Sequence, residues 1–275
     1  MYRKPFGRLA LNRSSGITRG LVGAWALNEG NSVEQAKDLS GNRNHGDKTA
    51  CEVGRGLNGP GALFNATTSL INCGSGASLD DMSAITVVAW IYPLSTGEGG
   101  AAKIVAKRGD VAALAGWQFG LAAGPVLNFV ADHATTDISA NSAVAPALNQ
   151  WSQVVCRWDG GTTASSGIQF FINGRDVGLA ASPTNGAGAR VSDAANPLII
   201  GNLGPAAERT FDGLIDHVLV FNRIVLIAEL ALLYRDPYMW LRPEKAFRYA
   251  AIAAGGFQPA WAANSNVLLG GSMVL

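Results

Sequence analysis

The sequence predicts an all-β fold, an antiparallel β-sandwich with one short helix near its C-terminal end. Three observations support this prediction. Short apolar segments recur along the chain, and many of them alternate or are rich in β-branched and aromatic residues. Glycine accounts for 34 of the 275 residues and is spread between these segments, as tight turns between short strands require. One late segment has helical spacing, and this combination is typical of a sandwich.

The clearest strands lie in the middle of the chain. Ile85–Pro93 is rich in β-branched and aromatic residues and stops at proline, as a strand does. Gln150–Trp158 alternates, and its more apolar set is predicted to face the core. Further strands are expected at Gly20–Leu27, Ala62–Phe64, Ser69–Asn72, Lys103–Ala106, Gly116–Leu121, Val126–Ala131, Leu198–Gly201 and Gly213–Phe221.

Two local signals fix a hairpin and a helix. Gly167–Ile172 is followed by Asn173-Gly174, which is the strongest short signal for a tight hairpin turn, and Arg175–Leu179 would be the returning strand. Ile224–Tyr234 has the spacing of one short helix. It is predicted to end before Asp236-Pro237, because the residue before a proline disfavours helical backbone.

Composition excludes several classes of protein. There are 21 basic and 20 acidic residues, so no basic surplus predicts a nucleic-acid partner. Only 15% of residues are charged, below the usual quarter or so, which indicates a surface partly covered by neighbours and favours a homo-oligomer. The three cysteines follow no disulfide or zinc spacing. Buried, reduced cysteines in a protein made in a reducing compartment are the expectation.

Three zones are expected along the chain. Residues 1–20 form a basic N-terminal arm without the apolar segment of a signal peptide, and residues 21–235 form the β-domain. No stretch approaches the roughly twenty apolar residues of a membrane span. Residues 236–275 form an aromatic and apolar tail. This tail is either an interface segment or a strand and loop that complete the same domain.

Several motifs resemble those of laminin-G-like, concanavalin-A-like jelly-roll domains. Gly20–Gly30 (GLVGAWALNEG) is similar to the opening of these domains, and Asp38–Gly46 (DLSGNRNHG) is similar to one of their loops. The resemblance spans about residues 20–235 and implies a jelly roll, but it is specific for no ligand. It continues through Gly61–Phe64, Ile85–Ile91, Trp151–Val154, Ile172–Gly174, Ile200–Gly201 and Phe211–Arg223.

The segments on either side resemble chains from bacteriophage genomes. These are the sequence from Leu11 (LNRSSGITRGLVGAW) and residues 236–243 (DPYMWLRP). The resemblance implies a non-enzymatic virion surface protein, a capsid decoration or head fibre. It would be made in the host cytoplasm, and its partner would be the major capsid protein or another virion protein. The alternatives are a carbohydrate-binding module of a phage adhesin or tail fibre, with a surface glycan bound by loops 95–116 and 180–196, and a glycoside hydrolase.

No catalytic residues are predicted. A glycoside hydrolase needs two carboxyl groups at a defined separation. Asp80 and Asp81 are adjacent and would face opposite ways on a strand, and a turn at Gly213 is expected to separate Asp212 from Asp216. The histidines have no metal-ligand spacing. They are His45, His133 and His217, of which His217 is expected to be exposed.

The resemblance also implies one structural calcium ion, for which Asp38 and Asp216 are the candidate ligands. The alternative is that Asp38 caps a turn by its own hydrogen bonds and Asp216 orders the same loop. Aromatic side chains raise a similar choice. Trp90, Trp117 and Trp158 would either stack on a sugar or fill the core, which is the more usual fate of such residues.

Overall fold

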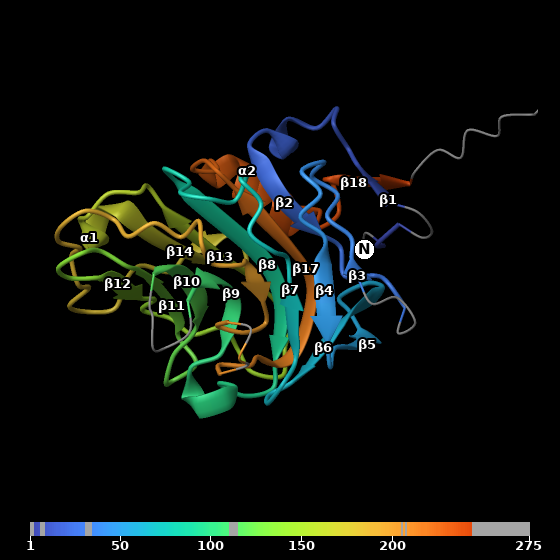
Figure 1. Cartoon of the computed structure of the whole chain (residues 1–275). Helices are drawn as coiled ribbons and strands as arrows, with labels where there is room; N and C mark the ends of the chain where they lie inside the picture. The colour runs from blue at the N-terminus through green and yellow to red at the C-terminus, as the bar shows by residue number, and fades with distance from the viewer. Residues whose placement is uncertain are drawn as a thin grey trace, which may run out of the picture. The chain divides into compact units, whose positions relative to one another are not determined.

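The computed structural model describes residues 3–5, 9–30, 35–109, 115–204, 206 and 208–243. The chain divides into a compact unit Met1–Pro243 and a second unit Glu244–Leu275, which lies outside the described residues. The predicted all-β class is confirmed, because the described residues form two antiparallel sheets stacked as a sandwich (Figure 1). No helix among the described residues is long and apolar enough to cross a membrane.

The first sheet, here the β8 sheet, is built around a long strand that pairs on both sides. β8 pairs in antiparallel register with β13 and with β17. Its strands run in the order β15 (Arg175–Asp176), β14 (Ile168–Ile172), β13 (Ser152–Trp158), β8 (Ile85–Pro93), β17 (Asp212–Phe221), β6 (Pro60–Asn65) and β5 (Glu52–Arg55), with β2 (Leu21–Trp25) also paired to β17.

The second sheet, here the β9 sheet, also has eight strands. Its centre pairs β9 with β10 and with the two-residue strand β16. The order is β12 (Ile138–Asn141), β11 (Leu127–Ala131), β10 (Gly116–Leu121), β9 (Lys103–Arg108), β16 (Ile199–Ile200), β7 (Leu70–Asn72), β4 (Gly46–Thr49) and β3 (Gln35–Ala36).

The main core lies between the two sheets. On β13 the predicted apolar set of Val154, Cys156 and Trp158 points into it, which confirms the alternation seen in the sequence. On β10, Trp117 and Phe119 point into the same core. These side chains have almost no exposed surface, so the sandwich is held together by burial of apolar area.

A second core covers the outer face of the β8 sheet. There Val155 and Phe171 pack with Leu230 and Leu233 of α2 (Ile227–Arg235) and with Trp240. The same layer contains β1 (Leu9–Leu11), which pairs with β18 (Leu241–Pro243), and the short 3-10 helix η1 (Gly16–Thr18). α2, β1 and β18 lie together along the upper side of Figure 1. The described parts of both terminal zones therefore pack on the sandwich.

Local predictions hold well, with two errors. The turn expected at Gly213 is absent, because Asp212–Phe221 is the single strand β17. Asn173 and Gly174 both have positive φ, at 51° and 73°, and join β14 to β15 as predicted. The predicted helix is α2, shifted slightly toward the C-terminus. The prediction that His217 is exposed is wrong, because the second core covers its face of β17 and leaves it 1% exposed. β4, β5, β12 and the pair β1–β18 were not expected; the remaining short elements are η2 (Glu98–Gly100) and α1 (Ala164–Gly167).

Candidate functional site

The outer face of the β9 sheet, here the β9 face, is the sheet surface that α2, β1 and β18 leave free. Directly opposed residues in antiparallel strands point to the same side. Gln118 lies between the core residues Trp117 and Phe119, so it and its partners point outward. One row crosses all eight strands: Ser139, Val130, Gln118, Ala106, Ile199, Asn72, Asp47 and Gln35.

Very small side chains occur on β9 and β10 in the middle of the β9 face, between Ile199 and Val130. Ala106 lies in the central row, and Gly116 and Gly120 flank Gln118 on β10. A Cβ at Gly116 would lie 2.0 Å from the Lys107 carbonyl oxygen, and one at Gly120 would lie 2.2 Å from the Ala102 carbonyl oxygen. Larger residues are thus excluded at both glycines. This strip of small residues has little exposed surface, since Ala106 is 0% and Gln118 6% exposed.

Lys103 stands at one end of this strip, opposite Gly120. The residue is only 4% exposed, yet its ammonium has no hydrogen-bond or ion-pair partner in the part of the chain that the structure describes. Burial, together with the nearby charges of Arg209 and Arg108, lowers the pKa of Lys103 to about 8. The Arg209 guanidinium is half-buried and donates to the Gly99 carbonyl oxygen at 3.4 Å, with no carboxylate partner among the described residues.

Arg108 stands at the other end, opposite Gly116, and its charge is compensated. Its Nε donates to Asp132 Oδ2 at 2.7 Å, and its Nη2 contacts the second oxygen of the same carboxylate. Nη2 also lies 3.5 Å from Asp137 Oδ2. Burial raises the pKa of Asp132 against the opposing effect of Arg108, and the neighbouring Asp137 adds to the rise. At one end of the strip Arg108 is paired with carboxylates, whereas at the other end neither Lys103 nor Arg209 has a carboxylate partner among the described residues.

Neutral amides supply most of the remaining polar groups of the β9 face. The buried Oε1 of Gln118 has no partner among the described residues. Asn128 Nδ2 donates to Asn141 Oδ1 at 2.9 Å, and Asp47 Oδ1 accepts from Gln35 Nε2 at 2.9 Å. Amides both donate and accept, which suits a ligand rich in hydroxyl groups.

The carboxylates near this face are poorly placed for glycoside hydrolysis. Asp47 on β4 and Asp132 after β11 are separated by five strand spacings, roughly 24 Å, whereas hydrolysis uses carboxyl groups about 5 to 10 Å apart. Asp132 and Asp137 lie close together, but both contact Arg108. The Asp132 carboxylate is thus engaged in charge-assisted hydrogen bonds with a guanidinium group.

Asp38 does not fit the calcium role that the resemblance implies. Its Oδ1 accepts from the backbone N–H of Ala24 at 3.0 Å and of Ser40 at 2.8 Å. Its Oδ2 accepts from Ser40 Oγ at 2.8 Å and from the Asn44 N–H at 3.0 Å. These four bonds use the four acceptor positions of a carboxylate, so Asp38 holds the loop as the sequence alternative supposes.

Asp216 lies in a different environment and shares none of these partners. Its Oδ1 lies 3.2 Å from Lys4 Nζ and accepts from the Leu57 N–H at 2.9 Å. Its Oδ2 lies 2.8 Å from His217 Nδ1 and 3.1 Å from the Tyr238 hydroxyl. Within the described ranges, no group of three His, Cys, Asp or Glu residues could hold a metal. Asp38 and Asp216 thus do not assemble a calcium site, and Asp216 orders the Leu57 loop rather than the Asp38 loop.

The three candidate tryptophans belong to the packed interior. Trp117 and Trp158 are fully buried in the main core, and Trp90 stacks on Tyr234 of α2 with ring centroids 5.8 Å apart. Any sugar platform built from these three rings is therefore ruled out by their burial.

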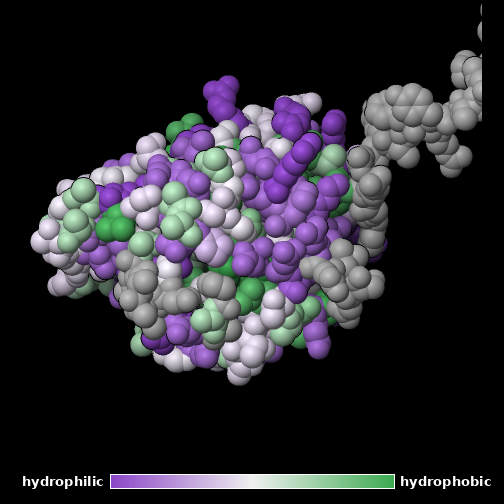
Figure 2. Space-filling view, in the orientation of Figure 1, coloured by the Kyte–Doolittle hydropathy of each residue, from purple (hydrophilic) through white to green (hydrophobic). Residues whose placement is uncertain are grey.

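In the view of Figure 2, hydrophobic residues form only small separate patches between hydrophilic ones.

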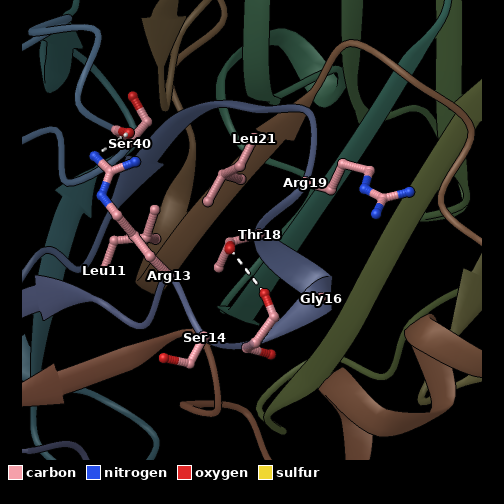
Figure 3. A pocket seen from close by; sticks show the side chains of 9 residues that line it. Leu11, Arg13, Ser14, Gly16, Thr18, Arg19, Leu21 and Ser40 are labelled. Carbon is pink, nitrogen blue, oxygen red and sulfur yellow. Dashed lines mark hydrogen bonds between the residues drawn. The ribbon is translucent and has the colours of Figure 1, made fainter.

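A pocket of about 310 Å³ lies beside η1, between the N-terminal segment and the Asp38 loop (Figure 3). Arg13 points toward the Ser40 carbonyl oxygen, 3.5 Å away, whereas the Arg19 side chain extends to the opposite side. Leu21 lies between them, Leu11 lies beside Arg13, and Thr18 Oγ1 donates to the Ser15 carbonyl oxygen at 2.9 Å. Because its two cations diverge, this pocket is a weaker candidate than the β9 face.

Sequence reasoning missed the unpaired pair of cations. No motif surrounds Lys103 or Arg209, which are 106 positions apart in the sequence. A backbone hydrogen bond brings the loop before β17 beside β9, where the Lys103 N–H donates to the Arg209 carbonyl oxygen at 3.0 Å. The available signal was a lysine opening the apolar strand Lys103–Ala106. Of the two predicted binding loops, 95–116 contains β9 itself, and 180–196 runs beside β12 at the edge of the same sheet.

The fold resembles several solved structures. The binding domain of Paraclostridial Mosquitocidal Protein 1 is 17% identical, with a TM-score of 0.61 over 81% of this chain and 53% of that one. Domain 4 of AbnA, a GH43 extracellular arabinanase from Geobacillus stearothermophilus solved with arabinotriose, is 17% identical, with a TM-score of 0.50 over 78% of this chain and 98% of its own. Trypanosoma rangeli sialidase in complex with sialic acid is 15% identical, with a TM-score of 0.56 over 80% and 33%.

These likenesses show the fold alone, and this chain spans about half of the mosquitocidal binding domain and a third of the sialidase. No curated protein sequence matches the chain. The family model described as the concanavalin A-like lectin/glucanases superfamily, a laminin G family, matches residues 65–231. Since this match covers more than half of the sequence, the chain belongs to that laminin G family of concanavalin A-like domains.

Proposed function

We propose that this chain is a non-enzymatic binding module that holds a carbohydrate against the β9 face. The observation that carries the proposal is the contrast between the two sheets. The outer face of the β8 sheet is covered by a second apolar core, whereas the β9 face, which lies outside both apolar clusters, carries small residues, amides and cations with little exposed surface. Shallow surfaces with hydrogen-bond donors and acceptors in fixed positions suit a hydroxyl-rich ligand.

The chain offers a matched pair of variants for the test. Gln118 and Gln153 are both buried strand glutamines with unpartnered amide atoms, but Gln118 lies on the β9 face and Gln153 on the covered face of the β8 sheet. In a glycan array followed by titration calorimetry, Gln118→Leu should weaken binding at least tenfold and Gln153→Leu should leave it unchanged. Equal effects of the two variants would place the site elsewhere, and no binding to any glycan would refute the proposal.

The absence of catalysis is part of the same proposal and has its own test. Asp132 and Asp137 are the close carboxyl pair of the β9 face. The bound glycan should be recovered intact after prolonged incubation with the protein. Release of reducing ends that Asp132→Asn or Asp137→Asn abolishes would instead make the chain a hydrolase, since general acid and base groups cannot be replaced by amides.

We also propose, from the resemblance of its flanking segments to bacteriophage chains, that the module belongs to a virion surface. The described residues 9–20 and 236–243 pack on their own sandwich, so attachment to a capsid protein or a sister copy would use another surface. Quantitative mass spectrometry of purified particles tests this proposal. A copy number near that of the shell protein supports decoration, a few copies support a fibre or adhesin, and absence from particles refutes it.

A further inference from the structure

The β9 face holds two cations that the described part of the protein does not neutralise. Lys103 is 4% exposed and lies beside the half-buried Arg209, whose backbone oxygen accepts its N–H at 3.0 Å. Burying an unpaired charge is costly, and two like charges side by side add to that cost. The described residues contain four other strongly buried cations, and the charged group of each has hydrogen-bond or ion-pair partners, unlike the Lys103 ammonium. These are Lys4 with Asp216, Lys107 with Asp80 and Asp193, Arg108 with Asp132, and Arg157 with the Val225 carbonyl oxygen and Gln169.

Nearby carboxylates are turned away from this pair. Glu98 Oε2 accepts both the N–H and the hydroxyl of Thr210, each at 3.0 Å, and Asp212 Oδ2 accepts from Ser95 Oγ at 2.6 Å. The Arg209 guanidinium reaches only the Gly99 carbonyl oxygen among the described residues. The pair is thus held in place by the fold without an anion supplied by the described chain.

We infer that the ligand of the β9 face is an acidic saccharide, whose carboxylate or sulfate group binds between Lys103 and Arg209. This inference rests on the proposed carbohydrate-binding function and names the class of its ligand. An anion there would form charge-assisted hydrogen bonds with both cations, while hydroxyl groups of the same chain would lie along Gln118 and Asn128. A nucleic acid is disfavoured, because a phosphate backbone requires an extended basic surface and the chain has a net charge of only +1.

The titration of Lys103 provides an internal check. The charged groups acting on it are Arg209 and Arg108, which stay protonated at all accessible pH values. An anion stabilises the ammonium form, so affinity should fall as pH rises above about 8, by up to tenfold per pH unit. Lys103→Arg keeps a permanent charge and should remove this alkaline loss.

The experiment is a glycan array of matched pairs: sialylated and desialylated, sulfated and desulfated, uronate and carboxyl-reduced. The intact protein should bind acidic members at least tenfold more tightly than their neutral counterparts. Lys103→Met and Arg209→Gln should lose this preference, and Arg13→Gln, which changes a cation near Ser40, should keep it. The matched glycan pair whose two members differ in affinity shows whether the bound group is a carboxylate or a sulfate. Melting temperatures near that of the parent confirm that the variants are folded.

Three results would overturn the inference. Equal binding of acidic and neutral members, unaffected by Lys103→Met, would refute the acidic class and leave the proposed carbohydrate function intact. Binding of no glycan would refute both. Tighter binding of single-stranded DNA than of any acidic glycan, lost in Arg209→Gln, would assign the two cations to a phosphate polymer instead.

Discussion

Replacing Lys4 by methionine should destabilise the protein strongly, although this residue lies almost at the N-terminus. Its side chain is 1% exposed. Its ammonium donates to the carbonyl oxygens of Ala26 at 2.7 Å, Pro60 at 2.6 Å and Asp216 at 2.8 Å. It also lies 3.2 Å from the Asp216 carboxylate, which is itself fully buried. Methionine has similar length and removes only the charge and the donors.

The magnitude follows from what would be left behind. Three buried carbonyl oxygens would lose a charged donor, and Asp216 would keep only the Leu57 N–H, the Tyr238 hydroxyl and His217. Breaking a buried ion pair by removing one partner costs about 3 to 5 kcal/mol. For a chain of this size, that corresponds to a fall in melting temperature of roughly 6 to 20 °C.

Thermal and urea unfolding of Lys4→Met would measure this loss, with the exposed Lys37→Met as the matched control, for which about 0.5 kcal/mol or less is expected. Adding Asp216→Asn to Lys4→Met removes both charges. The double variant should then lose less stability than the sum of the two single variants. Each single variant leaves one buried ion without its partner, whereas the double variant leaves none. A loss below about 1 kcal/mol in Lys4→Met would show that the N-terminal segment does not dock as described.

Three further outcomes are expected. Burial lowers the pKa of His217 despite the opposing effect of Asp216, so the folded state binds fewer protons than the unfolded state below the ordinary histidine pKa of about 6.5. Stability should therefore fall by up to about 2 kcal/mol between pH 7 and pH 5, and His217→Gln should flatten this part of a urea-unfolding series. Gln153 is fully buried, and neither amide atom has a partner among the described residues, so Gln153→Leu should raise the free energy of unfolding by about 1 to 2 kcal/mol; a loss of stability would reveal a bound water. Leu230→Ala in α2 should cost about 2 to 5 kcal/mol in the same assay, and a cost under about 1 kcal/mol would mean that the second core contributes little.

Short-range patterns predicted most of the sandwich. Asn173-Gly174 fixed a hairpin because its two residues accept positive φ, and Ile85–Pro93 predicted the bounds of β8 without error. Strands with weak patterns were missed. β4 is Gly46–Thr49, which has no apolar alternation, and its pairing with β7 depends on a partner more than twenty positions away. Such strands are stabilised by their neighbours in the sheet rather than by their own sequence.

The second core could not be predicted from alternation. On β13 the set Gln153, Val155 and Arg157 looks like the solvent side of a half-buried strand, yet all three are buried. The reason lies far away in the chain, where α2 and Trp240 cover this face. The misplacement of His217 has the same cause. A strand pattern shows which side is more apolar, but it does not show whether the less apolar side is covered by another segment.

The candidate site depends even more on long-range geometry. Asp38 and Asp216 were singled out by resemblance, and both turn out to hold backbone and side-chain donors. Lys103 and Arg209 carry no motif, and only the contact of β9 with the distant loop before β17 shows that they are neighbours without a carboxylate partner among the described residues. A constellation of this kind is visible in sequence only if its members sit close together in the chain.

The arrangement of the layers connects the terminal segments with the β9 face. Each sheet of a sandwich has two faces, and the apolar contact between the sheets uses one of each. Here the N-terminal segment, α2 and Trp240 cover the outer face of the β8 sheet with apolar contacts, and Lys4 anchors the same segment through Asp216. The proposed binding is thereby assigned to the β9 face, whose outward residues are glycines, an alanine, polar side chains and the apolar Val130 and Ile199. The same division explains why Gln153 and Gln118, both buried with unpartnered amide atoms, are expected to differ in their effects: one faces a sealed core, and the other faces the strip where a ligand would complete its hydrogen bonds.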